Sequence, residues 1–167
     1  VLVEPMLRDA LTGQLRTLRP YLPLLKLAAF LLLTANRLGL YRRHLETIDL
    51  RELDREFRTR LAEPGGGEAL VKRYASPLHD LKIMPSANFL QDLVEVERPL
   101  PLEKIHAPFL ALLSTGRTFA DPNITRALLS RLPQGEIQML DAKHWIPTEQ
   151  PQAMRGMIEA WCEKIDH

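Results

Sequence analysis

The sequence predicts an α/β fold in which the strands of a parallel sheet are interrupted by a helical insertion. Two observations support this prediction. Residues 7–98 show apolar side chains at helical spacing, with little sign of strands. Residues 99–167 instead alternate strand, helix, strand and helix, which is the order of a parallel sheet. Residues 1–6 predict one further core strand, so we expect the chain to divide into three segments.

The first strand is the short apolar run Val1–Val3, which Glu4 and Pro5 close as the exit from a buried strand. So short a strand has no local partner at the start of the chain. We therefore expect the chain to be the C-terminal part of a longer protein, or the second chain of a cleaved one. No basic region precedes an apolar one, so this start is not typical of a signal peptide.

Helical periodicity divides the insertion into several helices. Leucines at helical spacing predict a helix over residues 11–18, which Pro20 ends. Residues 24–35 form a wide apolar stripe, and Gly39 is a candidate C-cap. The remaining predicted elements are a helix over residues 50–62 capped by Asp49, a loop over residues 64–67, and helices over residues 68–74 and 86–94.

The uncharged run Leu27–Asn36, within a predicted helix, is too short to span a bilayer. A basic cluster, Arg42–His44, follows it. Two interpretations are open for this helix: it lies on a membrane surface, or it packs against its own protein. We favour the second, and we expect no membrane span.

The last third of the chain has strand-like apolar runs. Residues 109–113 form an unbroken apolar run, which is typical of a strand covered on both faces. Asp121 and Pro122 predict a helix that extends to Leu132, with the acid as N-cap and the proline at the first helical position. The remaining predicted elements are a strand over residues 136–140 and a helix over residues 148–165.

Charge and cysteine content exclude several classes of protein. The chain has 22 Lys and Arg against 21 Asp and Glu, so its net charge of +1 predicts no nucleic-acid partner. The single cysteine, Cys162, excludes a disulfide framework and the cysteine-rich zinc sites. We expect no metal and no cofactor. A lone cysteine fits a reducing compartment, so we expect a cytoplasmic protein.

Three short motifs flank the last two strands. Ile105–Pro108 precedes the first strand, Asp141–Trp145 follows the second, and Glu149–Pro151 opens the final helix. This pattern, above all His-Trp followed by Glu-x-Pro, resembles the C-terminal part of the α/β-hydrolase superfamily. The resemblance implies that residues 1–6 are a core strand of the hydrolase sheet and that residues 7–98 are a helical cap. Residues 99–167 would then be the C-terminal part of the hydrolase core.

The nucleophile of that superfamily is absent from this sequence. The family places it in a Gly-x-Ser-x-Gly turn, ahead of the acid and the histidine in the chain. No serine here has those neighbours; the four are Ser76, Ser86, Ser114 and Ser130. The resemblance therefore implies a partner, the N-terminal half of the same protein, that supplies the nucleophile and the oxyanion hole.

His144 is the candidate catalytic base. The resemblance places that base after the last strand, at the sheet edge where open α/β sheets bind ligands. An imidazole suits the role because it takes up and releases protons near neutral pH. We expect one ring nitrogen of His144 to contact a carboxylate, which would hold the ring in the productive tautomer.

Two carboxylates compete to be that acid, because the family uses either of two strand ends. Asp121 lies a few residues after the strand at 109–113, but its place before a proline is better explained as a helix N-cap. Glu4 stands directly at the exit of the first strand. We favour Glu4 and keep Asp121 as the alternative, while Asp141 is a weaker candidate because it lies only three residues before His144.

The resemblance implies a serine-type esterase or thioesterase. The leucine-rich insertion, with Phe30 and Phe89, suits a small, apolar acyl or aromatic substrate. Trp145 either lines the rim of the active site, where it would bind substrate, or packs beneath the cap. Two alternatives stay open: a catalytically inactive binding protein with the same fold, and a dehalogenase or lyase, because dehalogenases can have a Glu at the place of Glu4. The oligomeric state also stays open, a homo-oligomer included.

Overall fold

The computed structural model describes residues 1–41, 44–63 and 77–165 and divides the chain into two compact units. The sheet unit comprises Val1–Gly13 and Pro99–His167, and the helical unit comprises Gln14–Arg98. The first boundary therefore follows residue 13 rather than residue 6. The reason is that Leu7 and Ala10 are buried in the same apolar cluster as residues of the sheet.

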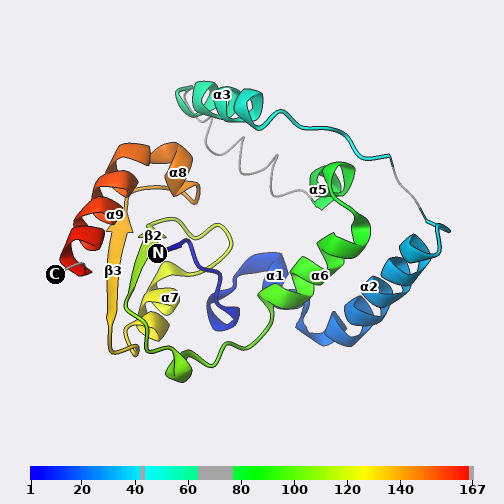
Figure 1. Ribbon diagram of the computed structural model, residues 1–167, viewed down its shortest axis with the longest axis horizontal. Coiled ribbons are helices and arrows are strands. Elements are labelled where there is room, and N and C mark those ends of the chain that lie inside the picture. The colour runs from blue at the N-terminus through cyan, green and yellow to red at the C-terminus, as the bar shows by residue number, and fades with distance from the viewer. Residues whose placement is uncertain (42–43, 64–76, 166–167) are drawn as a thin grey trace. The chain divides into compact units, whose positions relative to one another are not determined.

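The sheet has three parallel strands in the order β1 (Leu2–Val3), β2 (Phe109–Ser114) and β3 (Gly135–Leu140). Leu2 pairs with Ala111, and β2 pairs with β3 along its whole length. The labels of β2 and β3 lie next to each other in Figure 1. Parallel strands end at the same edge, so the chain leaves all three at one side of the sheet. The prediction of an α/β fold with a parallel sheet is confirmed.

The central strand β2 faces a separate apolar core on each side. Phe109 and Ala111 are buried with residues of α7 (Pro122–Leu129), whereas Leu110 and Leu112 are buried against residues of α9 (Pro151–Ile165). Every residue of β2 is buried, which confirms the prediction of a strand covered on both faces. Each fully buried leucine contributes about 1.5–3 kcal/mol relative to an exposed one, so β2 anchors the sheet unit.

The last helix differs from its prediction at the N-terminus. Instead of one helix from residue 148, the structure has α8 (Ile146–Glu149) and then α9. Gln150 separates them with a non-helical backbone, φ −134° and ψ 51°. The cause is Pro151, which lacks an N–H and disfavours the helical conformation of the residue before it. Met154 and Trp161 of α9 pack on the core, whereas Ala153 is exposed.

Among the described residues, the helical unit consists of short and medium helices with one 3₁₀ turn, and two further 3₁₀ turns lie in the sheet unit. The predicted helix over residues 11–18 is shorter than expected, because Leu11 instead forms an antiparallel bridge with Ala120. The predicted loop at 64–67 and helix at 68–74 lie outside the described residues. The observed elements are η1 (Arg8–Ala10), α1 (Gly13–Thr17), η2 (Arg19–Tyr21), α2 (Leu22–Arg37), α3 (Leu50–Leu61), α5 (Pro77–Ile83), α6 (Ser86–Val96) and η3 (Leu102–Lys104).

Within the helical unit, α2 packs against α6. The small residues Ala29 of α2 and Ala87 of α6 are the buried positions of these two helices. Gly39 follows the end of α2 with φ +71°, a left-handed conformation that glycine adopts without steric cost. No helix among the described residues is both long and apolar enough to cross a membrane. Arg42 and Arg43 of the basic cluster lie outside those residues.

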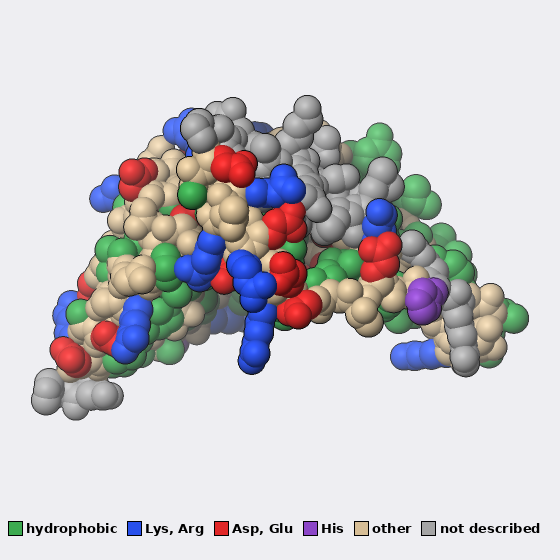
Figure 2. All heavy atoms as spheres, turned by 90° about the horizontal axis from the view of Figure 1, so that it is seen from above, with side chains coloured by type: hydrophobic (Ala, Val, Ile, Leu, Met, Phe, Trp, Pro, Cys, Tyr) green, Lys and Arg blue, Asp and Glu red, His purple; other side chains and the backbone are tan. Residues whose placement is uncertain are grey.

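The surface of α3 is dominated by ion pairs between successive turns. Asp49 caps the helix, as predicted, by accepting hydrogen bonds from the backbone N–H groups of Arg51 and Glu52. Arg58 pairs with Asp54 at 2.8 Å, four positions away, and a similar pair follows along the helix. Acidic and basic side chains are accordingly interspersed on the face drawn in Figure 2. Exposed pairs of this kind contribute only about 0.3–0.5 kcal/mol each.

Candidate functional site

Glu4 and His144 meet at the carboxyl-terminal edge of the sheet. Glu4 directly follows β1, and His144 lies in the loop after β3. The carboxylate oxygen Oε2 of Glu4 is 3.0 Å from Nδ1 of His144, although the two residues are 140 positions apart. Their side chains are only 18% and 19% exposed. The structure thus brings together the two residues that the sequence analysis pairs.

The backbone at Glu4 has an unusual conformation. Its N–H still donates to the carbonyl of Leu112, 2.9 Å away, so the ladder between β1 and β2 extends to this residue. Its φ is +50°, in the left-handed region that residues with a side chain seldom adopt. Pro5 follows and restricts the backbone of Glu4 further. Such conformations cost about 1–3 kcal/mol and are concentrated at functional sites.

Ser114, the last residue of β2, holds the Glu4 carboxylate from the neighbouring strand. Its backbone N–H donates to Oε1 of Glu4. Its hydroxyl donates to Oε2 over 2.9 Å, the same oxygen that faces His144. The Glu4 carboxylate therefore has defined partners on both oxygens.

These contacts determine which nitrogen of His144 holds the proton. An ionised carboxylate can only accept hydrogen bonds, so Nδ1 of His144 must donate to Glu4. A neutral ring with a proton on Nδ1 has an unprotonated Nε2 that can accept one. That is the tautomer that a general base needs.

The backbone around His144 is held by Glu149, at the end of α8. One oxygen of its carboxylate accepts hydrogen bonds from the N–H groups of His144 and Trp145, at 3.0 and 2.8 Å. The other oxygen accepts from the N–H of Lys143 at 2.8 Å. These N–H groups precede α8 and have no intrahelical partner, so Glu149 satisfies them as a capping-box side chain does.

Two aromatic rings flank the imidazole of His144. The ring of Phe119 lies edge-on to it with centroids 4.7 Å apart, and the ring of Trp145 does so at 5.7 Å. Both aromatic residues are half-buried. Edge-to-face contacts of this kind restrict how a ring can turn. Trp145 therefore packs on His144 itself, and a role in substrate binding stays a prediction.

The loop after β2 and the loop after β3 touch at Gly116. Its N–H donates to the carbonyl of Ala142 at 3.1 Å. A Cβ atom at Gly116 would collide with the backbone of Lys143. Thr118 adds a hydrogen bond from its hydroxyl to the carbonyl of Lys143, 3.2 Å away. Glycine at position 116 thus allows the His144 loop to lie against the end of β2.

A small cavity of about 20 Å³ lies beside the pair. That volume is enough for about one water molecule. Polar and apolar side chains both contribute to its wall, which is formed by Glu4, Pro5, Met6, Leu113, Gly116, Ala120, Pro122, Thr125 and His144.

The two other carboxylates considered as the acid have other partners. Asp121 caps α7, as predicted, by accepting from the N–H groups of Asn123 and Ile124. Its second oxygen is 3.6 Å from the guanidinium of Arg117. The Asp141 carboxylate accepts a hydrogen bond from the hydroxyl of Thr115 at 3.4 Å. Among the three candidates, Glu4 is the one in contact with His144.

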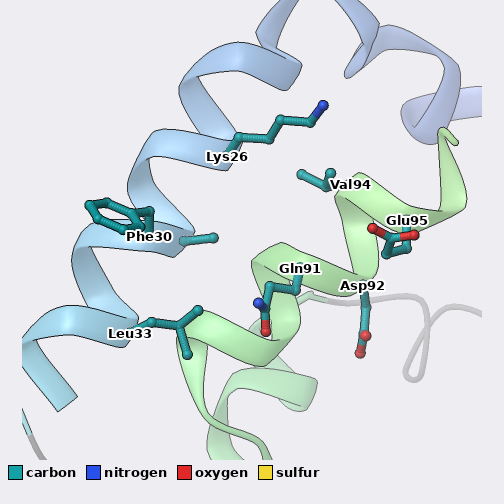
Figure 3. A pocket seen from close by; sticks show the side chains of 8 residues that line it. Lys26, Phe30, Leu33, Gln91, Asp92, Val94 and Glu95 are labelled. Atoms are coloured by element: carbon teal, nitrogen blue, oxygen red, sulfur yellow. The ribbon is translucent and has the colours of Figure 1, made fainter. Parts of the chain in front are cut away.

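A larger, open cavity of about 600 Å³ lies between α2 and α6 in the helical unit. Ligand pockets usually have volumes of about 300–1,000 Å³. Figure 3 shows Lys26 reaching from α2 toward Val94 of α6. The wall combines apolar with charged or polar side chains: Lys26, Ala29, Phe30, Leu33, Gln91, Asp92, Val94 and Glu95.

Sequence reasoning missed three residues that shape the site. From the sequence, Ser114 is only a serine that lacks the neighbours of a nucleophile, and Glu149 is only part of the motif that opens the final helix. Phe119 has no sequence signal that distinguishes it from other loop aromatics. For Glu149, the available signal was its position shortly after His144 and ahead of a proline, which allows the side chain to reach back.

Among the described residues, no group of three or more His, Cys, Asp or Glu side chains is placed to hold a metal ion. Cys162 is exposed and forms no disulfide.

Comparisons of the chain with protein-family models, with curated proteins and with solved structures find no match.

Proposed function

We propose that this chain is part of a serine-type α/β-hydrolase that cleaves an ester or thioester of a small apolar substrate. The single observation that supports the proposal best is the contact between Glu4 and His144 at the carboxyl edge of a parallel sheet. Open α/β sheets bind their ligands at that edge. The nucleophilic serine is supplied by the N-terminal half of the same protein, outside these residues.

In the proposed reaction, Nε2 of His144 takes the proton of the serine hydroxyl as its oxygen attacks the substrate carbonyl. The imidazolium then gives this proton to the leaving alcohol or thiol, and an acyl-serine remains. A water molecule next loses a proton to Nε2 and attacks the acyl group. As the bond between the acyl group and the serine breaks, Nε2 gives this proton to the serine oxygen, so the acid leaves and the serine hydroxyl is restored. Glu4 stabilises the imidazolium in both steps and stays ionised.

The substitution Glu4→Gln tests the proposed role of the acid directly. The N–H of Ser114 faces Oε1 of Glu4, so we expect the amide oxygen of the new side chain to take that position. The amide NH₂ would then face Nδ1 of His144 as a donor. The ring would be forced into the tautomer with its proton on Nε2, which cannot accept the serine proton. We expect a loss of about 10⁴-fold in kcat, as for the equivalent change in a serine protease.

The experiment uses the full-length protein with p-nitrophenyl esters and acyl thioesters of increasing chain length. A fluorophosphonate probe reports whether a serine is activated. His144→Ala should abolish both hydrolysis and labelling. His106→Ala, a change at an exposed histidine, is the matched control and should leave both intact.

A second measurement separates this proposal from the alternatives. The placement of Glu4 is also compatible with a dehalogenase, in which an aspartate replaces the serine as the nucleophile. Halide release without fluorophosphonate labelling would favour that reaction and contradict the esterase proposal. If the full-length protein neither hydrolyses esters nor releases halide, and substitution of His144 changes nothing, the proposal of an enzyme fails and a binding protein with this fold takes its place.

A further inference from the structure

We propose that Ser114 is a positioning residue: its hydroxyl sets the orientation of the Glu4 carboxylate and, through it, the tautomer of His144. The inference rests on the proposed function, in which Glu4 orients the base. It adds to that site a residue from β2, the strand between those that precede Glu4 and His144. The supporting evidence is a set of contacts in which one oxygen of Glu4 is shared by Ser114 and His144.

The backbone alone does not determine where the Glu4 carboxylate points. Glu4 lies at the exit of β1, after only two paired residues, and its own side chain has several rotatable bonds. One oxygen, Oε1, accepts from the backbone N–H of Ser114. A single anchor at one oxygen leaves the carboxylate free to turn about that contact.

The hydroxyl of Ser114 provides the second anchor. It lies 2.9 Å from Oε2 of Glu4 and 3.5 Å from the carbonyl of Lys143, the residue before His144. Two anchors from one residue hold the carboxylate in one plane, with Oε2 directed at Nδ1 of His144. Ser114 is 2% exposed, so water does not readily replace its hydroxyl.

Because Ser114 is buried, the acceptor to which its hydroxyl proton points determines how the Glu4 carboxylate is oriented. The hydroxyl has one proton and two acceptors within reach, the Glu4 carboxylate and the Lys143 carbonyl. The carboxylate is both closer and charged, and charge-assisted hydrogen bonds are stronger than neutral ones. The proton therefore goes to Oε2, which strengthens the orientation of that oxygen while leaving it able to accept from Nδ1.

The strained backbone of Glu4 is consistent with this role. A left-handed conformation before a proline is unfavourable, so the folded protein must compensate for it with local contacts. The two hydrogen bonds from Ser114 are contacts of that kind. We infer that the end of β2 holds Glu4 in a conformation that the residue would not adopt alone.

The test is the full-length variant Ser114→Ala, with the ring nitrogens of ¹⁵N-labelled histidine observed by NMR at an alkaline pH, where imidazole is neutral. The ring signal of His144 is assigned from its loss in His144→Ala. We expect the fraction of His144 with its proton on Nδ1 to fall clearly below the wild-type value. We also expect kcat to fall by about 10- to 100-fold with KM little changed, as for a catalytic group that is misplaced.

Two further variants make the result specific. Ser114→Thr keeps the hydroxyl and should restore the wild-type tautomer. Ser130→Ala is the matched control. The hydroxyl of Ser130 donates to the carbonyl of Arg126 in α7, so its removal should change neither the tautomer of His144 nor kcat. An unchanged tautomer in Ser114→Ala would overturn the inference, even if that variant were less stable. A tautomer that depends on Ser114 in a protein without hydrolase activity would instead leave the inference standing and refute the proposed function.

Discussion

The carboxylate of Glu149 accepts a hydrogen bond from the backbone N–H of His144, with 3.0 Å between the nitrogen and Oε1. The same carboxylate accepts from the N–H groups on both sides of that residue. Glu149 therefore fixes the main chain of the His144 loop, whereas Glu4 contacts its ring. The ring and the main chain of the candidate base are held by two different carboxylates.

Removing the Glu149 carboxylate should make the loop that contains His144 more mobile. In Glu149→Ala, three N–H groups lose their acceptor, and we expect a loss of about 0.5–2 kcal/mol in the free energy of unfolding, as for a lost helix cap. Amide hydrogen exchange at residues 143–145 should become clearly faster. The control is Glu159→Ala, because Glu159 lies on an exposed face of α9, where it pairs with Arg155. Unchanged exchange at residues 143–145 would show that Glu149 does not hold the loop.

Two glycines should respond in opposite directions to the same substitution. Gly116→Ala forces a methyl group against the backbone of Lys143, and overpacking of this kind costs about 1–3 kcal/mol. Gly156→Ala adds a methyl group in the middle of α9, where nothing lies within contact distance, so the helix should gain about 0.5–1 kcal/mol. Urea unfolding midpoints measure both changes. A stabilising Gly116→Ala would contradict the close approach of the two loops.

The parallel sheet could be predicted from local signals. The unbroken apolar run at residues 109–113 indicates a strand buried on both faces, and Asp121 with Pro122 marks the start of α7. The pairing of Glu4 with His144 follows from topology, because parallel strands end at one edge. These features depend on short stretches of sequence and on a general rule of sheet geometry.

The rest of the site depends on contacts between distant segments. Nothing near Ser114 in the sequence shows that its hydroxyl meets a side chain 110 positions away. The left-handed backbone at Glu4 was likewise unpredictable, because propensity disfavours it and only tertiary contacts can maintain it. The break at Gln150 could have been predicted from Pro151, but the helical pattern on both sides obscured it.

The alternative acid Asp121 gives a prediction that separates capping from catalysis. Asparagine caps a helix about as well as aspartate does, so Asp121→Asn should leave both stability and the His144 tautomer close to wild type. Asp121→Ala should cost about 0.5–2 kcal/mol of stability and still leave the tautomer unchanged. Thermal unfolding and ring ¹⁵N shifts measure the two effects. A loss of activity in Asp121→Asn, with stability retained, would assign the acid to Asp121 rather than Glu4.

The ion pair between β3 and α9 should make stability depend on pH. Lys164 donates to Glu136 at 2.8 Å and Gln138 donates to its other oxygen at 2.7 Å. The hydrogen bond from Lys164, and then that from Gln138, lowers the pKa of Glu136 below its ordinary value of 4.5. The folded state therefore binds this proton less tightly than the unfolded state. The stability that the ionised Glu136 adds to the folded state is fully present above the pKa that Glu136 has in the unfolded state. It is lost as the pH falls through the lower pKa that Glu136 has in the folded state.

We expect Glu136→Gln to remove this part of the pH dependence. The difference in urea midpoint between wild type and variant should shrink as the pH falls from about 6 to about 3, across the ordinary range for a glutamate. The effect should be small, at most about 1 kcal/mol, because Lys164 is 71% exposed and exposed pairs are weak. Added salt should reduce it further, since exposed charges are screened. A difference between the two proteins that stays constant over this pH range would show that Glu136 does not titrate with a lowered pKa.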